Sequence, residues 1–98
     1  MVYSLEEIKS LVDPVARQFD IHEIRLFGSY FDSIPTSQSD IDLVVKYGNG
    51  CRGLDRIRFM NALEDKLNKT VDVLNVDFLP DFFKDIDLQS EERLIYAK

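Results

Sequence analysis

Two apolar runs, residues 21–27 and 41–47, constrain the fold of this chain more than any other feature of its sequence. The second run is rich in β-branched residues, and both adjoin turn-forming residues, so each is predicted to form a β-strand. In the first run Ile24 and Leu26 lie on one face, whereas Arg25 and Phe27 lie on the other. The two runs therefore predict two strands, joined by a polar loop over residues 32–39.

Helical periodicity is found before and after these strands. Ser4 and Glu7 match the S-x-x-E pattern of a capping box, and apolar residues then recur at helical spacing as far as Phe19. Pro14 interrupts this stripe without changing its phase, so we expect one bent helix. A second apolar stripe predicts a second helix with one buried face, formed by Leu54, Ile57, Met60, Leu63 and Leu67.

The rest of the chain adds two strands and a region of turns. Residues 71–76 are predicted to form a third strand, residues 77–88 short helical turns around Pro80, and residues 94–96 a closing strand. Because strands and helices are mixed, the order predicts an α+β fold, with a small mixed β-sheet and helices packed on one face. A length of 98 residues predicts a single domain over residues 1–98.

The charge balance restricts the partners that the chain can have. Its 18 acidic and 12 basic residues leave a net charge of -6, which disfavours a long nucleic acid, because such binders usually present a basic face. Nucleotides remain possible ligands when divalent cations bridge the two negative partners. The single cysteine, Cys51, fits a reducing environment, and no apolar window approaches the length of a membrane span. We therefore expect a cytoplasmic protein with no membrane partner, small enough that self-association or a permanent partner could stabilise it.

Asp40 and Asp42 are the first candidates for chemistry. They stand two positions apart at the start of the second strand, so their side chains share a face. Carboxylates placed in this way can share divalent cations, and a set of oxygen ligands favours Mg²⁺ or Mn²⁺ over zinc. The alternative is a solvated strand end, because the Asp-x-Asp pattern alone is common.

Two further features make the pattern more specific. Gly28 follows an apolar strand, where a glycine lets the backbone approach a phosphate closely, and Ser29 adds a hydroxyl. A helical turn after them would present free N–H groups to an anion. Asp72 stands between two valines, where a carboxylate is costly to bury unless it is paired or bound to a metal. If its strand lies beside that of Asp40 and Asp42, the three carboxylates form a cluster; the alternative is an exposed Asp on an edge strand.

In combination these motifs resemble the minimal nucleotidyltransferases of the DNA polymerase beta-like superfamily, over nearly the whole chain. The matching runs are Phe27-Gly28-Ser29, Ser39-Asp40-Ile41-Asp42-Leu43-Val44-Val45 and Val71-Asp72-Val73. The resemblance implies that Gly28 and Ser29 hold the triphosphate, with Ser39 also in the nucleotide-binding set. It implies that Asp40 and Asp42 ligate two Mg²⁺ ions. Asp72 would ligate the catalytic ion and accept the proton of the acceptor hydroxyl.

The reaction implied is attack of a hydroxyl on the α-phosphate of ATP, with release of pyrophosphate. One position departs from the family pattern Gly-Ser-x-Ala-Arg-Gly, because Asp32 occupies the place of the arginine. An arginine there would offset phosphate charge, which Asp32 cannot do, so nucleotide affinity or turnover is expected to be lower. Arg25 and Lys46 are the cations considered as substitutes.

The same resemblance extends to the antitoxins of bacterial toxin–antitoxin pairs whose toxin is a helical HEPN-type ribonuclease. It implies that a tyrosine of the toxin is the acceptor and becomes adenylylated. Two alternatives stay open: an interaction module that neutralises its partner by occlusion, and a subunit that modifies a small molecule. The aromatic residues between Phe78 and Phe83 are expected to lie mostly in the core, with some available as a docking surface.

Overall fold

The computed structural model describes residues 2–81, 83 and 90–98, without the side chain of Asp32. The elements follow the predicted order: α1 (Leu5–Ala16), β1 (Ile21–Phe27), α2 (Ser29–Asp32), β2 (Ile41–Tyr47), α3 (Leu54–Leu67), β3 (Val71–Asn75), the 3-10 helices η1 (Val76–Phe78) and η3 (Glu91–Arg93), and β4 (Leu94–Ala97). The described helices include none that is long and apolar enough to cross a membrane.

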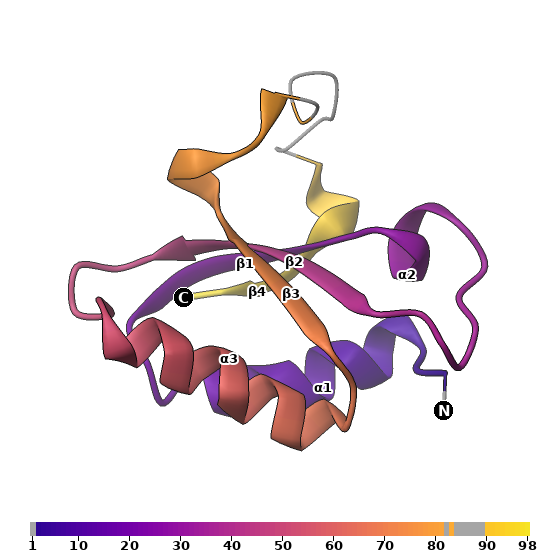
Figure 1. Cartoon of the computed structure of the whole chain (residues 1–98), viewed down its shortest axis with the longest axis horizontal. Helices are drawn as coiled ribbons and strands as arrows, with labels where there is room; N and C mark the ends of the chain where they lie inside the picture. The colour runs from indigo at the N-terminus through magenta and orange to yellow at the C-terminus, as the bar shows by residue number, and fades with distance from the viewer. Residues whose placement is uncertain (1, 82, 84–89) are drawn as a thin grey trace.

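The four strands form one mixed sheet in the order β3-β2-β1-β4. β1 is antiparallel to both β2 and β4, whereas β2 and β3 are parallel. Parallel neighbours need a long crossover, and α3 provides it between β2 and β3. Figure 1 shows α1 and α3 side by side beneath the sheet, which confirms the predicted α+β fold with helices on one face.

The main core lies between these helices and the sheet. The capping box of Ser4 and Glu7 is present, and α1 buries Ile8, Val12, Val15 and Ala16. α1 continues through Pro14, as predicted, and ends at Ala16. Phe19 lies beyond the helix, where its ring packs edge-on against Phe59 of α3 at 5.5 Å between centres.

The predicted buried face of α3 is wrong in its first turn. Leu54 and Ile57 are 66% and 51% exposed, whereas Phe59, Leu63 and Leu67 are buried. Leu54 precedes Leu63 by nine residues, which at 3.6 residues per turn places it half a turn away, on the opposite side of the helix. The ring contacts of Phe59 with Phe19 and Tyr47 orient the helix toward the sheet instead.

A smaller apolar cluster covers part of the other sheet face. Phe27, Val44 and Phe83 are buried there, and the rings of Phe27 and Phe83 meet edge-on at 5.3 Å. β3 ends at Asn75, one residue earlier than predicted, and the following η1 turns the chain over this face. Phe83 is therefore a core residue and Phe78 is 79% exposed. Phe82 and the rest of the predicted turn region, residues 84–88, lie outside the described residues.

Candidate active site

The strand register brings the predicted carboxylates together. Asp42 of β2 is paired with Asp72 of the parallel strand β3 and, on its other side, with Phe27 of β1. Paired residues point to the same face of a sheet, and for these it is the face opposite the helices. Asp40, two residues earlier, repels the Asp42 charge from just before β2. The cluster expected from the sequence is thus present at the edge where β2 and β3 begin.

The electrostatics of this cluster centre on Asp42. Partial burial, the hydrogen bond with Asp72, and the negative charges of Asp72 and Asp40 together raise the pKa of Asp42 from 3.8 to about 6. Two carboxyl groups can share a hydrogen bond only if one of them carries a proton. A divalent cation would relieve the same repulsion and replace that proton.

The donor set suits a hard cation, although it is not arranged as a finished metal centre. Within the described ranges, no group of three or more His, Cys, Asp or Glu side chains could hold a metal ion as it stands. Three carboxylates supply the oxygen ligands that Mg²⁺ prefers, so the chemistry of the residues fits this ion once Asp42 is ionised.

Gly28 is needed at this site for two separate reasons. Its backbone has φ 68° and ψ -160°, a conformation that is essentially limited to glycine. A Cβ at this position would overlap Oδ2 of Asp42 and lie 2.9 Å from its Cγ. The chain therefore approaches the carboxylate cluster closely at the end of β1. α2 follows at once, as predicted, with the Phe31 N–H donating to the Gly28 carbonyl at 3.0 Å.

The other predicted nucleotide-binding residues lie in the loops around the cluster. Ser29 is half-buried at the first position of α2. The hydroxyl of Ser39 accepts a hydrogen bond from the Thr36 N–H at 2.9 Å, so it closes the loop between α2 and β2. Their contacts with a nucleotide remain predictions. Asp32 ends α2, and its side chain lies outside the described part of the structure.

The two cations considered from the sequence are poorly placed to replace the missing arginine. Arg25 is buried and its Nη1 lies 2.6 Å from the carboxylate of Glu23. Lys46 is paired with the same Glu23 in the strand register, four residues along β2 from Asp42. At about 3.3 Å per residue this separates Lys46 and Asp42 by roughly 13 Å along the strand.

Sequence reasoning missed two other cations that lie near the site. Lys69 donates to the carbonyl oxygens of Ser37 and Ser39 at 3.0 and 3.3 Å, next to Asp40. Arg93 stacks on Phe27 and Phe31, on either side of Gly28. No local pattern could reveal these contacts, because they join residues about 30 or more than 60 positions apart.

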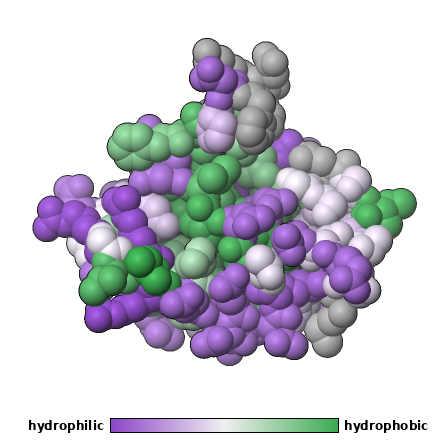
Figure 2. Space-filling view, viewed as in Figure 1, coloured by the Kyte–Doolittle hydropathy of each residue, from purple (hydrophilic) through white to green (hydrophobic). Residues whose placement is uncertain are grey.

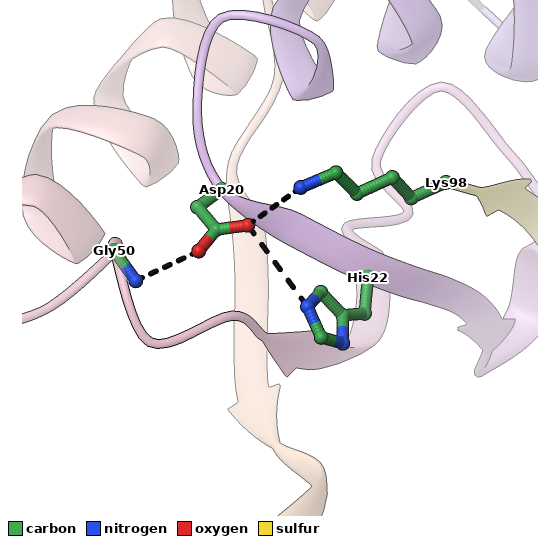
Figure 3. A network of polar contacts seen from close by, with 4 residues as sticks. All are labelled: Asp20, His22, Gly50 and Lys98. Atoms are coloured by element: carbon green, nitrogen blue, oxygen red, sulfur yellow. Dashed lines mark hydrogen bonds and ion pairs between the residues drawn. The ribbon is translucent and has the colours of Figure 1, made fainter.

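A second polar network occupies the opposite end of β1 (Figure 3). The carboxylate of Asp20 accepts hydrogen bonds from the Gly50 N–H at 2.7 Å and from Lys98 at 2.9 Å, and His22 lies 3.9 Å away. The hydrogen bonds from Lys98 and Gly50 lower the pKa of Asp20. This network fastens the loop after β2 and the end of β4 to β1, so its role is structural.

Comparison with known proteins identifies the family. A family model described as "Polymerase beta, Nucleotidyltransferase" matches residues 6–98. Two proteins of Methanocaldococcus jannaschii are similar to the chain, "Putative protein adenylyltransferase MJ0435" and "Putative protein adenylyltransferase MJ0126". The first is 34% identical over 82 residues, covering 84% of this chain and 88% of the relative. The second is 29% identical over 97 residues, covering 95% and 97%.

Solved structures agree with this result. The "Structure of putative minimal nucleotidyltransferase" matches with a TM-score of 0.69 and 27% identity, over 83% of this chain and 86% of that one. The "Crystal structure of the toxin-antitoxin with AMP-PNP" has a TM-score of 0.62 and 23% identity, and shows the shared fold. That match covers 74% of this chain and 60% of the other. The chain therefore belongs to the polymerase beta nucleotidyltransferase family, as one of its minimal nucleotidyltransferases.

Proposed function

We propose that this protein is a Mg²⁺-dependent adenylyltransferase that moves AMP from ATP to a hydroxyl acceptor. The pairing of Asp42 with Asp72, next to Gly28 and Asp40, is the observation that carries the proposal. The names of the two Methanocaldococcus jannaschii relatives support transfer of an adenylyl group, and they motivate ATP as the donor.

The chemistry proposed for each side chain is the one that the family resemblance implies. Asp40 and Asp42 would hold two Mg²⁺ ions, or Mn²⁺, and Asp72 would share one of them. When bound, these ions would neutralise phosphate charge and orient the attacking and leaving oxygens. Gly28 leaves room for the triphosphate, and Ser29 and Ser39 are its proposed hydroxyl contacts.

The reaction balances as a simple displacement. The acceptor oxygen forms a bond to the α-phosphorus of ATP, and the bond from that phosphorus to the bridging oxygen of pyrophosphate breaks. Asp72 takes the proton of the acceptor hydroxyl, which suits its exposed position on the edge strand β3. Pyrophosphate leaves with the negative charge, which bound cations would offset.

The acceptor in this proposal is a tyrosine of a helical HEPN-type toxin, so the protein acts as an antitoxin in the cytoplasm. Two toxin–antitoxin crystal structures contain a chain with this fold, and this likeness of fold is the support for a toxin as the partner. Two alternatives are a module that blocks its partner without catalysis and a subunit that modifies a small molecule.

One labelling experiment separates these possibilities. The protein is incubated with Mg²⁺, ATP labelled at the α-phosphate and the product of the adjacent gene. We expect label on that product, lost in Asp40→Asn and on chelation with EDTA. Asp65→Asn is the matched control, because Asp65 is exposed on α3, which lies against the other face of the sheet. A partner that is inhibited but unlabelled would contradict the enzymatic proposal and favour occlusion.

A further inference from the structure

Arg93 reaches the turn formed by Gly28 and Ser29 from the far end of the chain. Its guanidinium carbon lies 4.4 Å from the ring centre of Phe27 and 4.3 Å from that of Phe31. Its Nη1 donates a hydrogen bond of 3.3 Å to the carbonyl oxygen of Leu26. A guanidinium within about 6 Å of an aromatic ring centre is attracted to the face of the ring. One side chain thus contacts residues on both sides of the turn.

The short helix after this turn needs such an anchor. α2 has four residues, and its N-cap Gly28 makes no side-chain capping hydrogen bond. Its backbone is held by the Phe31 N–H at 3.0 Å from the Gly28 carbonyl and the Ser33 N–H at 3.4 Å from the Ser29 carbonyl. A single helical turn is unstable by itself, because nucleation restricts several residues for few hydrogen bonds. Burial of Tyr30 in the main core fastens one side of α2, and the stacking of Phe31 on Arg93 fastens another.

Arg93 also approaches the turn from a distinct direction. It ends η3, which precedes β4, and β4 pairs with β1 on the side away from β2. η3 contacts β1 directly, and Figure 1 shows it above the sheet, directly before β4 in the chain. Asp42 and Asp72 approach from β2 and β3 on the other side. The turn therefore lies between a cation and the carboxylate cluster.

We propose that Arg93 is a positioning residue that holds the Gly28 turn and α2 in the conformation that receives the triphosphate. Only the identity of the ligand rests on the function proposed above. Arg93 acts through Phe27, Phe31 and the Leu26 carbonyl rather than on the reacting atoms. Its removal should therefore raise the KM for ATP with little change in kcat.

The experiment compares Arg93→Ala and Arg93→Lys with the wild-type protein. Binding of Mg²⁺ and a non-hydrolysable ATP analogue is measured by calorimetry, and exchange of the Phe31 amide by NMR. Loss of two stacking contacts should weaken nucleotide binding about fivefold to thirtyfold in Arg93→Ala. Arg93→Lys should show most of this loss, because lysine keeps the charge without the planar stack. Both variants should also exchange the Phe31 amide about tenfold faster.

Lys98→Ala is the matched control. Lys98 is another cation near the C-terminus, and it donates a hydrogen bond to Asp20 (Figure 3). Asp20 precedes the start of β1, whereas the Gly28 turn follows the end of that strand. Equal losses of nucleotide affinity in Arg93→Ala and Lys98→Ala would overturn the inference, as would wild-type amide exchange in Arg93→Ala. If the wild-type protein binds no nucleotide, the proposed function fails, whereas the exchange measurement still decides whether Arg93 positions α2.

Discussion

The two glycines with positive φ offer a matched test of how the site is built. Gly28 has φ 68° and Gly53 has φ 57°, so an alanine is strained at either position. The surroundings differ, because a Cβ at Gly28 would overlap Asp42 whereas a Cβ at Gly53 meets nothing within 4 Å. Gly28→Ala therefore adds a collision with the site to the backbone strain that both substitutions share.

The difference between the two variants can be given a size. Backbone strain alone should destabilise either variant by about 1–3 kcal/mol. In Gly28→Ala the added methyl must also displace the Asp42 carboxyl group. At about pH 5, where Asp42 keeps its proton, losing its hydrogen bond with Asp72 costs about 1.5–3 kcal/mol. Gly28→Ala should then be less stable than Gly53→Ala by about 2 kcal/mol, which for a domain of this size corresponds to roughly 8–16 °C in Tm.

Urea and thermal denaturation of the two variants, followed by circular dichroism, measure this difference. The same pair is then compared in the Asp42→Ala background, where the carboxyl group is absent and the nearest Asp42 atom to the added methyl is Cβ at 3.3 Å. The difference between the glycine variants should shrink to a few tenths of a kcal/mol there. Equal stabilities of Gly28→Ala and Gly53→Ala with Asp42 present would refute the close approach of Gly28 to the cluster.

Three further predictions follow from the same structure. Folding raises the pKa of Asp42 to about 6, so the folded protein holds a proton that the unfolded chain releases near pH 4. The free energy of unfolding therefore decreases as the pH rises from about 4 to about 6, and it stays at the lower value above pH 6. Asp42→Asn should therefore match the wild-type stability near pH 4 and exceed it at pH 7 by about 1 kcal/mol after allowance for solvent screening, and equal pH profiles in urea titrations would contradict this. The pKa of Asp20 is lowered in the folded protein, so ionised Asp20 stabilises the fold above the unfolded pKa of 3.8. This stabilisation is lost as the pH falls through the lower pKa that Asp20 has in the folded protein. Asp20→Asn should lower Tm at pH 7 but converge with the wild type in acid. Leu63→Ala should cost about 2–5 kcal/mol, whereas Leu54→Ala should change stability by less than about 0.5 kcal/mol, and similar losses would restore the stripe expected from the sequence.

Local patterns in the sequence were sufficient to predict the elements and their order. The capping box at Ser4, the strand before Gly28 and the helical turn after it depend on neighbouring residues, so their signals survive without knowledge of the fold. The expectation that Asp40 and Asp42 share a face depends only on the period of a β-strand, and in the structure Asp40 lies just before β2. These features were enough to predict the α+β class and to locate the candidate site at the end of the first strand and the start of the second.

Tertiary structure decided how these pieces meet. A shift of one residue between β2 and β3 would turn Asp72 to the helix face, and only the crossover through α3 and the burial of Val71 select the observed register. The rotation of α3 depends on the rings that Phe59 meets, and Arg93 reaches Phe27 and Phe31 through the β4 pairing. Periodicity is a property of neighbours along the chain, so the sequence alone determined which residues of each strand share a face. Packing between distant segments decided which faces meet, and with that the raised pKa of Asp42 and the neighbours of Gly28.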